Sequence, residues 1–163
     1  MHKLYSLKKA KKILIATNNP GKFKELKEIL PKKIKYFKPR DFNLKEPIEN
    51  GKTFKANAKI KSLSAAKKTG IICISDDSGL EVDSLNKRPG IFSARWAGPS
   101  KDFNIAIKKI YNLLKKKNKL NSKARFVCAL SICYFDKIIS SVIGKIEGYI
   151  SKDIRGKNGF GYD

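Results

Sequence analysis

The sequence has few of the side chains that most often carry out chemistry near neutral pH. Its 163 residues include a single histidine, His2, which nearly excludes a Ser-His relay and a histidine-ligated zinc site. Three cysteines, Cys73, Cys128 and Cys133, lie in apolar runs and form no Cys-x-x-Cys pair. Their odd number and these positions favour buried, reduced thiols in the cytoplasm over disulfide bonds or metal ligands.

Long apolar runs and a secretion signal are also absent from the sequence. No run approaches the ~18 apolar residues that a membrane-spanning helix requires. Residues 1–12 are basic but lack the continuous apolar segment of a secretory signal, and we expect them to form a frayed extension. With 41% apolar residues, the composition predicts that residues 1–163 form one domain around a single core.

Arginine is scarce although the chain is strongly basic. Lysine and arginine together number 37 and give a formal net charge of +23, but only five of them are arginine. A surface this basic attracts polyanions whatever its fold, whereas specific readers of nucleic acids rely on arginine forks. Because the lysines are spread along the chain in short runs, we interpret the charge as a solvated surface without a specific nucleic-acid partner. A basic polyanion-binding protein stays open as the non-enzymatic alternative.

Two adjacent carboxylates follow a short apolar run in the middle of the chain. Residues 71–74 predict a buried strand, and residues 75–79 leave it through acidic and small side chains. Such a strand usually exposes a site at its C-terminal end. Because neighbouring strand residues point to opposite faces, only one of Asp76 and Asp77 can look straight into a cleft. A polar turn that simply ends the strand is the alternative.

A strand, a loop and a helix near the N-terminus predict an anion site. Residues 13–16 are apolar, residues 17–21 form a turn cluster, and residues 22–30 have apolar side chains at helical spacing before Pro31. Unpaired N–H groups and the positive end of the helix dipole both face such a loop, and Lys22 adds a full charge there. An ordinary strand-to-helix connection is the alternative interpretation.

The remaining pattern predicts an α/β fold with a mixed central sheet flanked by helices. Residues 53–68 and 102–117 have the apolar spacing of helices. Residues 124–135 and 137–150 are rich in β-branched and aromatic side chains and predict two long strands joined by a short turn. On the first of these helices, Lys61 lies one turn from Asn57, so the lysine could reach a phosphate.

Three motifs resemble the inosine/xanthosine triphosphate pyrophosphatase family, whose members hydrolyse non-standard purine nucleoside triphosphates. They are Thr17-Asn18-Asn19-Pro20-Gly21-Lys22, Ser75 to Leu80 with Pro89 to Gly98, and Gly159-Phe160-Gly161-Tyr162-Asp163. The resemblance runs from about Ile13 to the last residue. It implies a cytoplasmic, homodimeric, Mg²⁺-dependent enzyme that converts ITP, dITP or XTP to the monophosphate and pyrophosphate. A phosphatase that releases orthophosphate is the second enzymatic alternative.

The resemblance also implies a role for each site residue. Asp77 would be the catalytic residue and, with Glu49, a ligand of Mg²⁺. The residues implied to bind substrate are Thr17, Asn18, Asn19, Pro20, Gly21, Lys22 and Lys61 at the phosphates, Ser78, and Phe160, Gly161, Tyr162 and Asp163 at the nucleoside. The residues by themselves leave Asp76 open as the group that activates water, and Glu46 as the metal ligand.

In the family, a further segment with a lysine and a Ser-His-Arg motif follows the glycine-rich loop and contacts the purine base. The resemblance therefore implies either a chain truncated at Asp163 or a shortened member of the family, and the sequence leaves both open. Discrimination between inosine and guanosine requires hydrogen-bonding groups matched to the purine substituents. We accordingly expect these 163 residues to distinguish the two triphosphates poorly.

Overall fold

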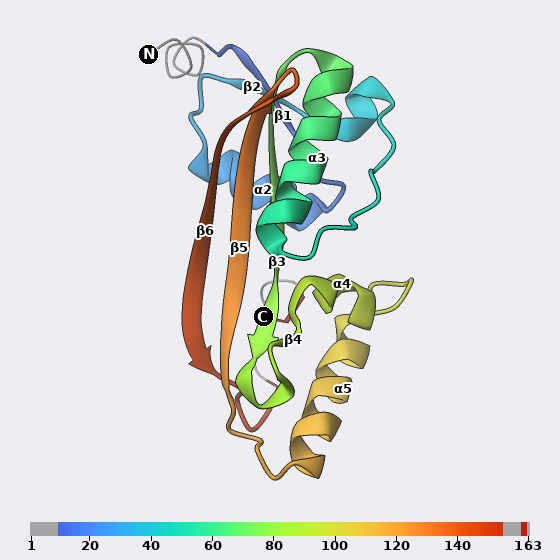
Figure 1. Cartoon of the computed structure of the whole chain (residues 1–163), viewed down its shortest axis with the longest axis vertical. Helices are drawn as coiled ribbons and strands as arrows, with labels where there is room; N and C mark the ends of the chain where they lie inside the picture. The colour runs from blue at the N-terminus through green and yellow to red at the C-terminus, as the bar shows by residue number, and fades with distance from the viewer. Residues whose placement is uncertain (1–9, 155–160, 163) are drawn as a thin grey trace. The chain divides into compact units, whose positions relative to one another are not determined.

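The computed structural model of this chain describes residues 10–154, 161 and 162 (Figure 1). Its backbone contacts divide the chain into two compact units. The first unit comprises Met1–Asp77 and Ala129–Ile143, and the second comprises Ser78–Cys128 and Gly144–Asp163. The single domain expected from the sequence stays a prediction.

The strands form one mixed sheet in the order β2-β1-β3-β5-β6, with β4 paired to β3. Strand β1 (Lys12–Ile15) lies between β2 (Lys35–Phe37) and β3 (Ile72–Val82), and both pairings are parallel. Strand β4 (Arg88–Pro89) runs antiparallel to β3. The mixed sheet predicted from the sequence is thus confirmed.

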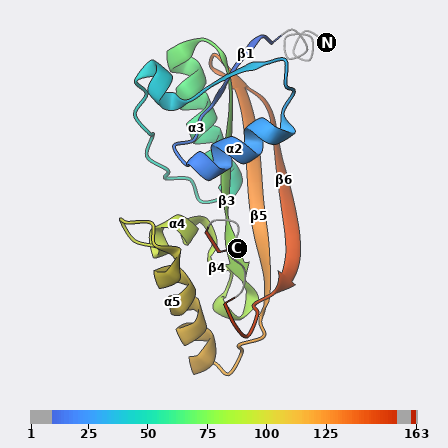
Figure 2. The ribbon, with the colours of Figure 1, turned by 180° about the vertical axis from the view of Figure 1, so that it is seen from behind.

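Two helices of the first unit cover opposite faces of its sheet (Figures 1 and 2). Helix α2 (Pro20–Ile29) packs its Leu26 against Ile72 and Ile74 of β3. Helix α3 (Phe54–Thr69) packs against Cys73, the residue between them. This alternation follows from the strand geometry, in which successive side chains point to opposite faces.

The second unit has its own core around helix α5 (Phe103–Lys116). The buried residues of this core are Leu80, Val82, Leu85, Ile110, Leu114 and Ala124. Short helices precede α5: α4 (Ser93–Trp96) and the 3₁₀ turns η2 (Asp83–Leu85) and η3 (Gly90–Phe92). A further 3₁₀ turn, η1 (Pro39–Phe42), lies in the first unit.

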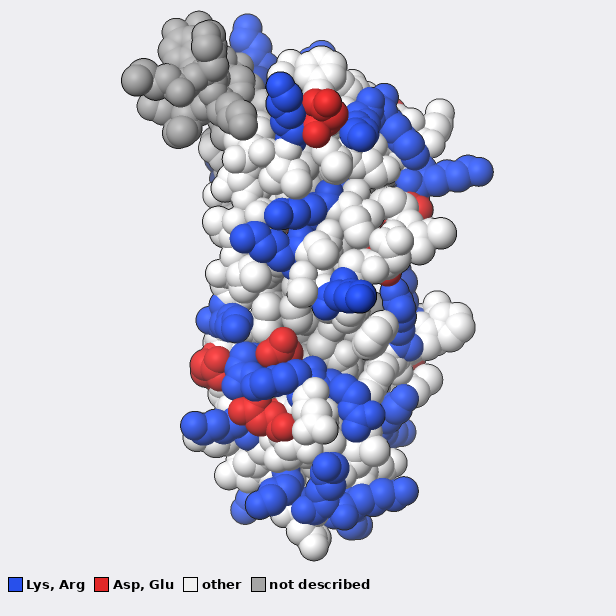
Figure 3. All heavy atoms as spheres, in the orientation of Figure 1, with Lys and Arg blue, Asp and Glu red and all other residues white. Residues whose placement is uncertain are grey.

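The long strands β5 (Lys123–Tyr134) and β6 (Lys137–Tyr149) are neighbours in the sheet and are joined through two residues, as the sequence pattern predicted. Both strands contribute residues to each unit. No helix among the described residues is long and apolar enough to cross a bilayer. On the face drawn in Figure 3, lysines and arginines are scattered over the surface rather than gathered in one patch.

Three expectations from the sequence are wrong. The strand expected to end at residue 74 continues to Val82, because its polar side chains find partners on the helices that cover it. Cys128 is exposed rather than buried, since its neighbours in the alternating strand β5 face the core. Lys12 begins β1 and is not part of a frayed extension.

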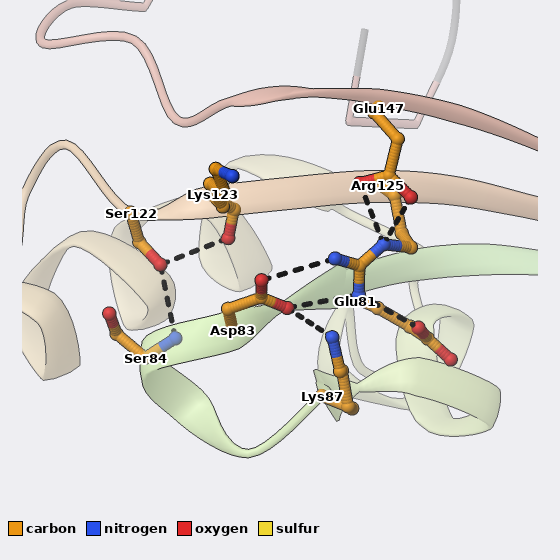
Figure 4. Close-up of polar contacts among 8 residues, drawn as sticks. All are labelled: Glu81, Asp83, Ser84, Lys87, Ser122, Lys123, Arg125 and Glu147. Carbon is orange, nitrogen blue, oxygen red and sulfur yellow. Dashed lines mark hydrogen bonds and ion pairs between the residues drawn. The ribbon is translucent and has the colours of Figure 1, made fainter.

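Arg125 of β5 joins three carboxylates within the second unit (Figure 4). Its guanidinium donates to both carboxylate oxygens of Glu147 at 2.7 and 2.9 Å and to those of Asp83 at 2.9 and 3.1 Å. One of its nitrogens also lies 3.5 Å from Glu81. The bonds from Lys87 and Arg125 lower the pKa of Asp83 to about 2. Three strand segments are thereby held together by one cation.

Replacing Arg125 by Met should lower the melting temperature at pH 7, because three carboxylates lose their shared cation. The depressed pKa of Asp83 means that its stabilising effect is present above the ordinary value of 3.8 and is lost as the pH falls toward about 2. The difference in melting temperature between wild type and variant should therefore shrink below about pH 4. Lys87→Met, which removes only one partner of Asp83, serves as the control and should lower the melting temperature less. Equal melting temperatures at pH 7 would contradict the prediction.

Candidate active site

The loop between β1 and α2 is held by its own side chains. Thr17 Oγ1 accepts a hydrogen bond from the amide of Asn19 at 3.2 Å, and Asn19 Oδ1 accepts one from the amide of Lys22 at 3.2 Å. Asn19 is thus the N-cap of α2, with Pro20 and then Gly21 in the first turn. The amide of Thr17 also donates to the carbonyl of Ile15 at 2.9 Å, so three amides of the predicted phosphate loop already have hydrogen-bond acceptors. The charge that this loop offers a phosphate comes from the helix end and from Lys22.

Asp76 and Asp77 diverge to opposite faces of β3, as the strand geometry requires. Asp76 points to the side of α2, where its Oδ2 lies 2.6 Å from Nζ of Lys22. Asp77 points to the side of α3, where its Oδ2 accepts a hydrogen bond of 3.0 Å from Nδ2 of Asn57. Both carboxylates are buried. Asp76 is thus paired with a residue of α2, and Asp77 with a residue of α3.

Asn57 links Asp77 to the loop that enters α3. While its Nδ2 donates to Asp77, its Oδ1 accepts a hydrogen bond from the amide of Gly51 at 2.8 Å. The asparagine side chain is 1% exposed. A Cβ on Gly51 would lie 2.5 Å from that Oδ1, so only glycine permits the contact. The sequence pattern indicates no site role for Asn57 or Gly51, since side-chain hydrogen bonds formed in the folded chain leave no periodic signal.

Lys61, one turn after Asn57 on α3, reaches the same region. Its Nζ lies 2.7 Å from Oε1 of Glu49, and only 8% of its side chain is exposed. Burial lowers the pKa of Lys61, but Glu49, Asp76 and Asp77 together raise it more, so the net shift is upward. The lysine stays protonated near neutral pH.

Burial is also the largest influence on Asp77. It raises the pKa of this carboxyl from 3.8 to about 6, against the opposing effects of Lys61 and Asn57. A carboxylate that titrates near neutral pH is well matched to removing a proton from water. Glu49 acts electrostatically on Asp77 in the same direction as burial. Glu46, the other candidate for a metal ligand, instead accepts a hydrogen bond of 3.2 Å from Nδ2 of Asn18.

The predicted nucleoside loop and Ser78 belong to the second unit. The hydroxyl of Tyr162 donates a hydrogen bond of 3.0 Å to the carbonyl of Ser93. Its ring packs edge-to-face against that of Phe103, with 5.2 Å between the ring centroids. Burial raises the pKa of Tyr162. Gly161 has a φ of +79°, a conformation that favours glycine. The predicted residues Phe160 and Asp163 lie outside the described part of the chain.

The donor set of the first unit fits a magnesium ion bound together with a nucleotide. Within the described ranges, no group of three or more His, Cys, Asp or Glu side chains could hold a metal. Mg²⁺ needs no such cage, because it commonly takes one or two carboxylates and completes its shell with waters and phosphate oxygens. Asp77 and Glu49 provide two carboxylates that act on each other. They are the residues that would hold the ion.

Fold and site together define an α/β protein whose first unit gathers buried carboxylates, two lysines and a helix N-terminus, a set suited to phosphate chemistry. The chain belongs to the Ham1 family, whose model matches residues 13–163. This match confirms the resemblance identified in the sequence.

Two relatives bear names that state an activity. The dITP/XTP pyrophosphatase of Zymomonas mobilis is 42% identical over 154 residues, covering 93% of this chain and 74% of the relative. The dITP/XTP pyrophosphatase of Bacillus subtilis is 43% identical over 162 residues, covering 94% of this chain and 78% of the relative. The chain thus spans about three quarters of the length of these relatives.

Two solved structures share the fold. A HAM1 protein from Coxiella burnetii has a TM-score of 0.84 and 36% identity, covering 93% of this chain and 79% of that protein. The Ham1 protein of Staphylococcus aureus has a TM-score of 0.81 and 39% identity, covering 94% of this chain and 79% of that protein. They confirm the predicted α/β fold with a mixed sheet flanked by helices.

Proposed function

We propose that this chain hydrolyses dITP, ITP and XTP to the monophosphate and pyrophosphate. The observation that carries the proposal is the buried Asp77, braced by Asn57 and beside Lys61, in a member of the Ham1 family. Its relatives over 93% of this chain are named dITP/XTP pyrophosphatases. In the reaction the oxygen of water bonds to the α-phosphorus, and the bond from that phosphorus to the bridging oxygen breaks. Pyrophosphate leaves with that oxygen.

The side chains of the first unit supply the parts that this reaction needs. Asp77 takes the proton of the attacking water, for which its pKa of about 6 is suited. Lys22 and Lys61 bind phosphate oxygens and oppose the charge of the triphosphate. Asp76 holds Lys22 through their 2.6 Å ion pair. Mg²⁺ on Asp77 and Glu49 would neutralise charge on the phosphate oxygens.

The nucleoside half of the substrate is assigned from the family motifs. We place the purine against Phe160, Gly161, Tyr162 and Asp163, and Ser78 against the substrate, as the family motifs imply. Gly161 has a positive φ that glycine adopts readily, and because glycine lacks a Cβ its backbone would permit close approach of a ligand. The enzyme is proposed to act as a homodimer in the cytoplasm. The buried thiols of Cys73 and Cys133 favour such a reducing compartment.

Product analysis tests this function. With Mg²⁺ and ITP, dITP or XTP, the purified chain should release pyrophosphate and the monophosphate in equal amounts, detected by ion-exchange chromatography with a pyrophosphate-specific assay. Orthophosphate should appear only after an inorganic pyrophosphatase is added, because the proposed cleavage releases both distal phosphates as one unit. Orthophosphate as the primary product, with the diphosphate as its companion, would identify a phosphatase instead.

A further inference from the structure

The ammonium group of Lys61 is bound to the carboxylate that we propose as a metal ligand. Its Nζ lies 2.7 Å from Oε1 of Glu49, and 26% of the glutamate side chain is exposed against 8% of the lysine. Asp77, the second proposed ligand, attracts the same ammonium. A cation of the protein therefore stands where the metal would have to bind.

The charges of the group formed by Glu49, Asp76, Asp77, Lys22 and Lys61 nearly balance without any ligand. Three carboxylates, on Glu49, Asp76 and Asp77, face two ammonium groups, on Lys22 and Lys61, which leaves one net negative charge (three minus two). A metal that bound Glu49 in the absence of a triphosphate would deprive the ammonium of Lys61 of its closest counter-ion, and weakening the pairing of a buried charge is unfavourable. A triphosphate arriving alone would meet the three carboxylates. Each ligand by itself is therefore opposed.

The two ligands together remove both obstacles. When a divalent metal takes the carboxylate of Glu49, the released ammonium finds a new counter-ion in the triphosphate. The metal in turn screens the carboxylates from the phosphates. Lys61 lies on helix α3, and Asp77 and Glu49 both act on its ammonium.

We propose that Lys61 exchanges its counter-ion on binding, from Glu49 in the free protein to the triphosphate in the loaded protein, and so makes metal and triphosphate bind cooperatively. The inference rests on the proposed function, because it takes Glu49 as a metal ligand and Lys61 as a phosphate ligand. By thermodynamic linkage, the factor by which the metal tightens triphosphate binding equals the factor by which triphosphate tightens metal binding. Lys61 accordingly weakens the binding of the metal alone and strengthens the binding of metal and triphosphate together.

The test measures Mn²⁺ binding by electron paramagnetic resonance, with and without an ITP analogue that carries a methylene bridge between the α- and β-phosphorus. Lys61→Met keeps the aliphatic stem and removes the charge. The variant should bind Mn²⁺ alone at least ~5-fold more tightly than wild type, because the competing ammonium is gone. It should bind the analogue in the presence of Mn²⁺ at least ~10-fold more weakly. Tighter binding of Mn²⁺ alone together with weaker binding of the analogue is the result that indicates exchange of the counter-ion.

Lys67→Met is the matched control, since it removes the same charge from an exposed position of the same helix. It should change neither affinity more than about twofold. Lys61→Gln provides a second variant if Lys61→Met shows an altered circular dichroism spectrum. Unchanged or weaker binding of Mn²⁺ alone to folded Lys61 variants would overturn the exchange, even if analogue binding falls. No Mn²⁺ binding by wild type with the analogue present would overturn the proposed metal site itself.

Discussion

Asp77→Asn should abolish most of the activity and at the same time make the folded protein more stable. Asparagine keeps the shape of the side chain and can still accept the hydrogen bond from Asn57, but it cannot take a proton from water. Turnover of ITP should fall by at least ~100-fold, the usual scale for loss of a general base. The measurement is steady-state kinetics at saturating Mg²⁺.

The gain in stability follows from the raised pKa of Asp77. Because its pKa is about 6 in the folded protein against an ordinary 3.8, the ionised carboxylate opposes folding, and wild-type stability falls as the pH rises between these values. In EDTA above about pH 6, Asp77→Asn should unfold with a free energy on the order of 1–3 kcal/mol larger than that of wild type. Near pH 4 the two proteins should be alike. Urea denaturation at both pH values measures this difference.

Asp76→Asn is the control for the assignment. Asp76 lies on the other face of the strand, in a 2.6 Å ion pair with Lys22. Removing its charge breaks a buried pair, so we expect this variant to lose stability rather than gain it. An active Asp77→Asn enzyme beside an inactive Asp76→Asn enzyme would transfer the catalytic role to Asp76. A loss of stability in Asp77→Asn at pH 7 would contradict the electrostatic argument.

Gly51→Ala should damage both folding and catalysis through the addition of one methyl group. The new Cβ would lie 2.5 Å from Oδ1 of Asn57 and 2.8 Å from Cβ of Ala56, so the loop or the asparagine has to move. Overpacking of this kind costs about 1–3 kcal/mol of stability. A shift of Asn57 also displaces Asp77, and displacements of about 1 Å can cost ~100-fold in rate. We expect kcat/KM for ITP to fall by ~10- to 100-fold.

Gly144→Ala adds the same methyl group on exposed strand β6, where a Cβ would meet nothing within 4 Å. Its unfolding free energy should stay within about 0.5 kcal/mol of wild type, and its kinetics should be unchanged. Near-normal kcat/KM in Gly51→Ala would show that the loop relaxes without moving Asn57. The brace between Gly51 and Asp77 would then have no part in positioning the carboxylate.

Local patterns in the sequence were sufficient to predict the helices and strands with strong periodicity. The spacing of apolar residues predicted α5 and α3 within about one residue of their observed ends. The β-branched and aromatic runs likewise predicted β5 and β6. For α2 the prediction began at Lys22, but the helix starts at Pro20, because proline is preorganised for the first helical position and Asn19 caps the end.

The side-chain pairing within the site was decided only by the tertiary structure. Strand alternation already required Asp76 and Asp77 to point apart, yet it could not say that Lys22 would meet one and Asn57 the other. That choice depends on helices packed on both faces of β3. The pairing of Lys61 with Glu49 depends likewise on the path of the loop before α3. Periodicity reports which face a residue occupies, whereas pKa values and counter-ions depend on neighbours distant in sequence that folding brings within a few ångströms.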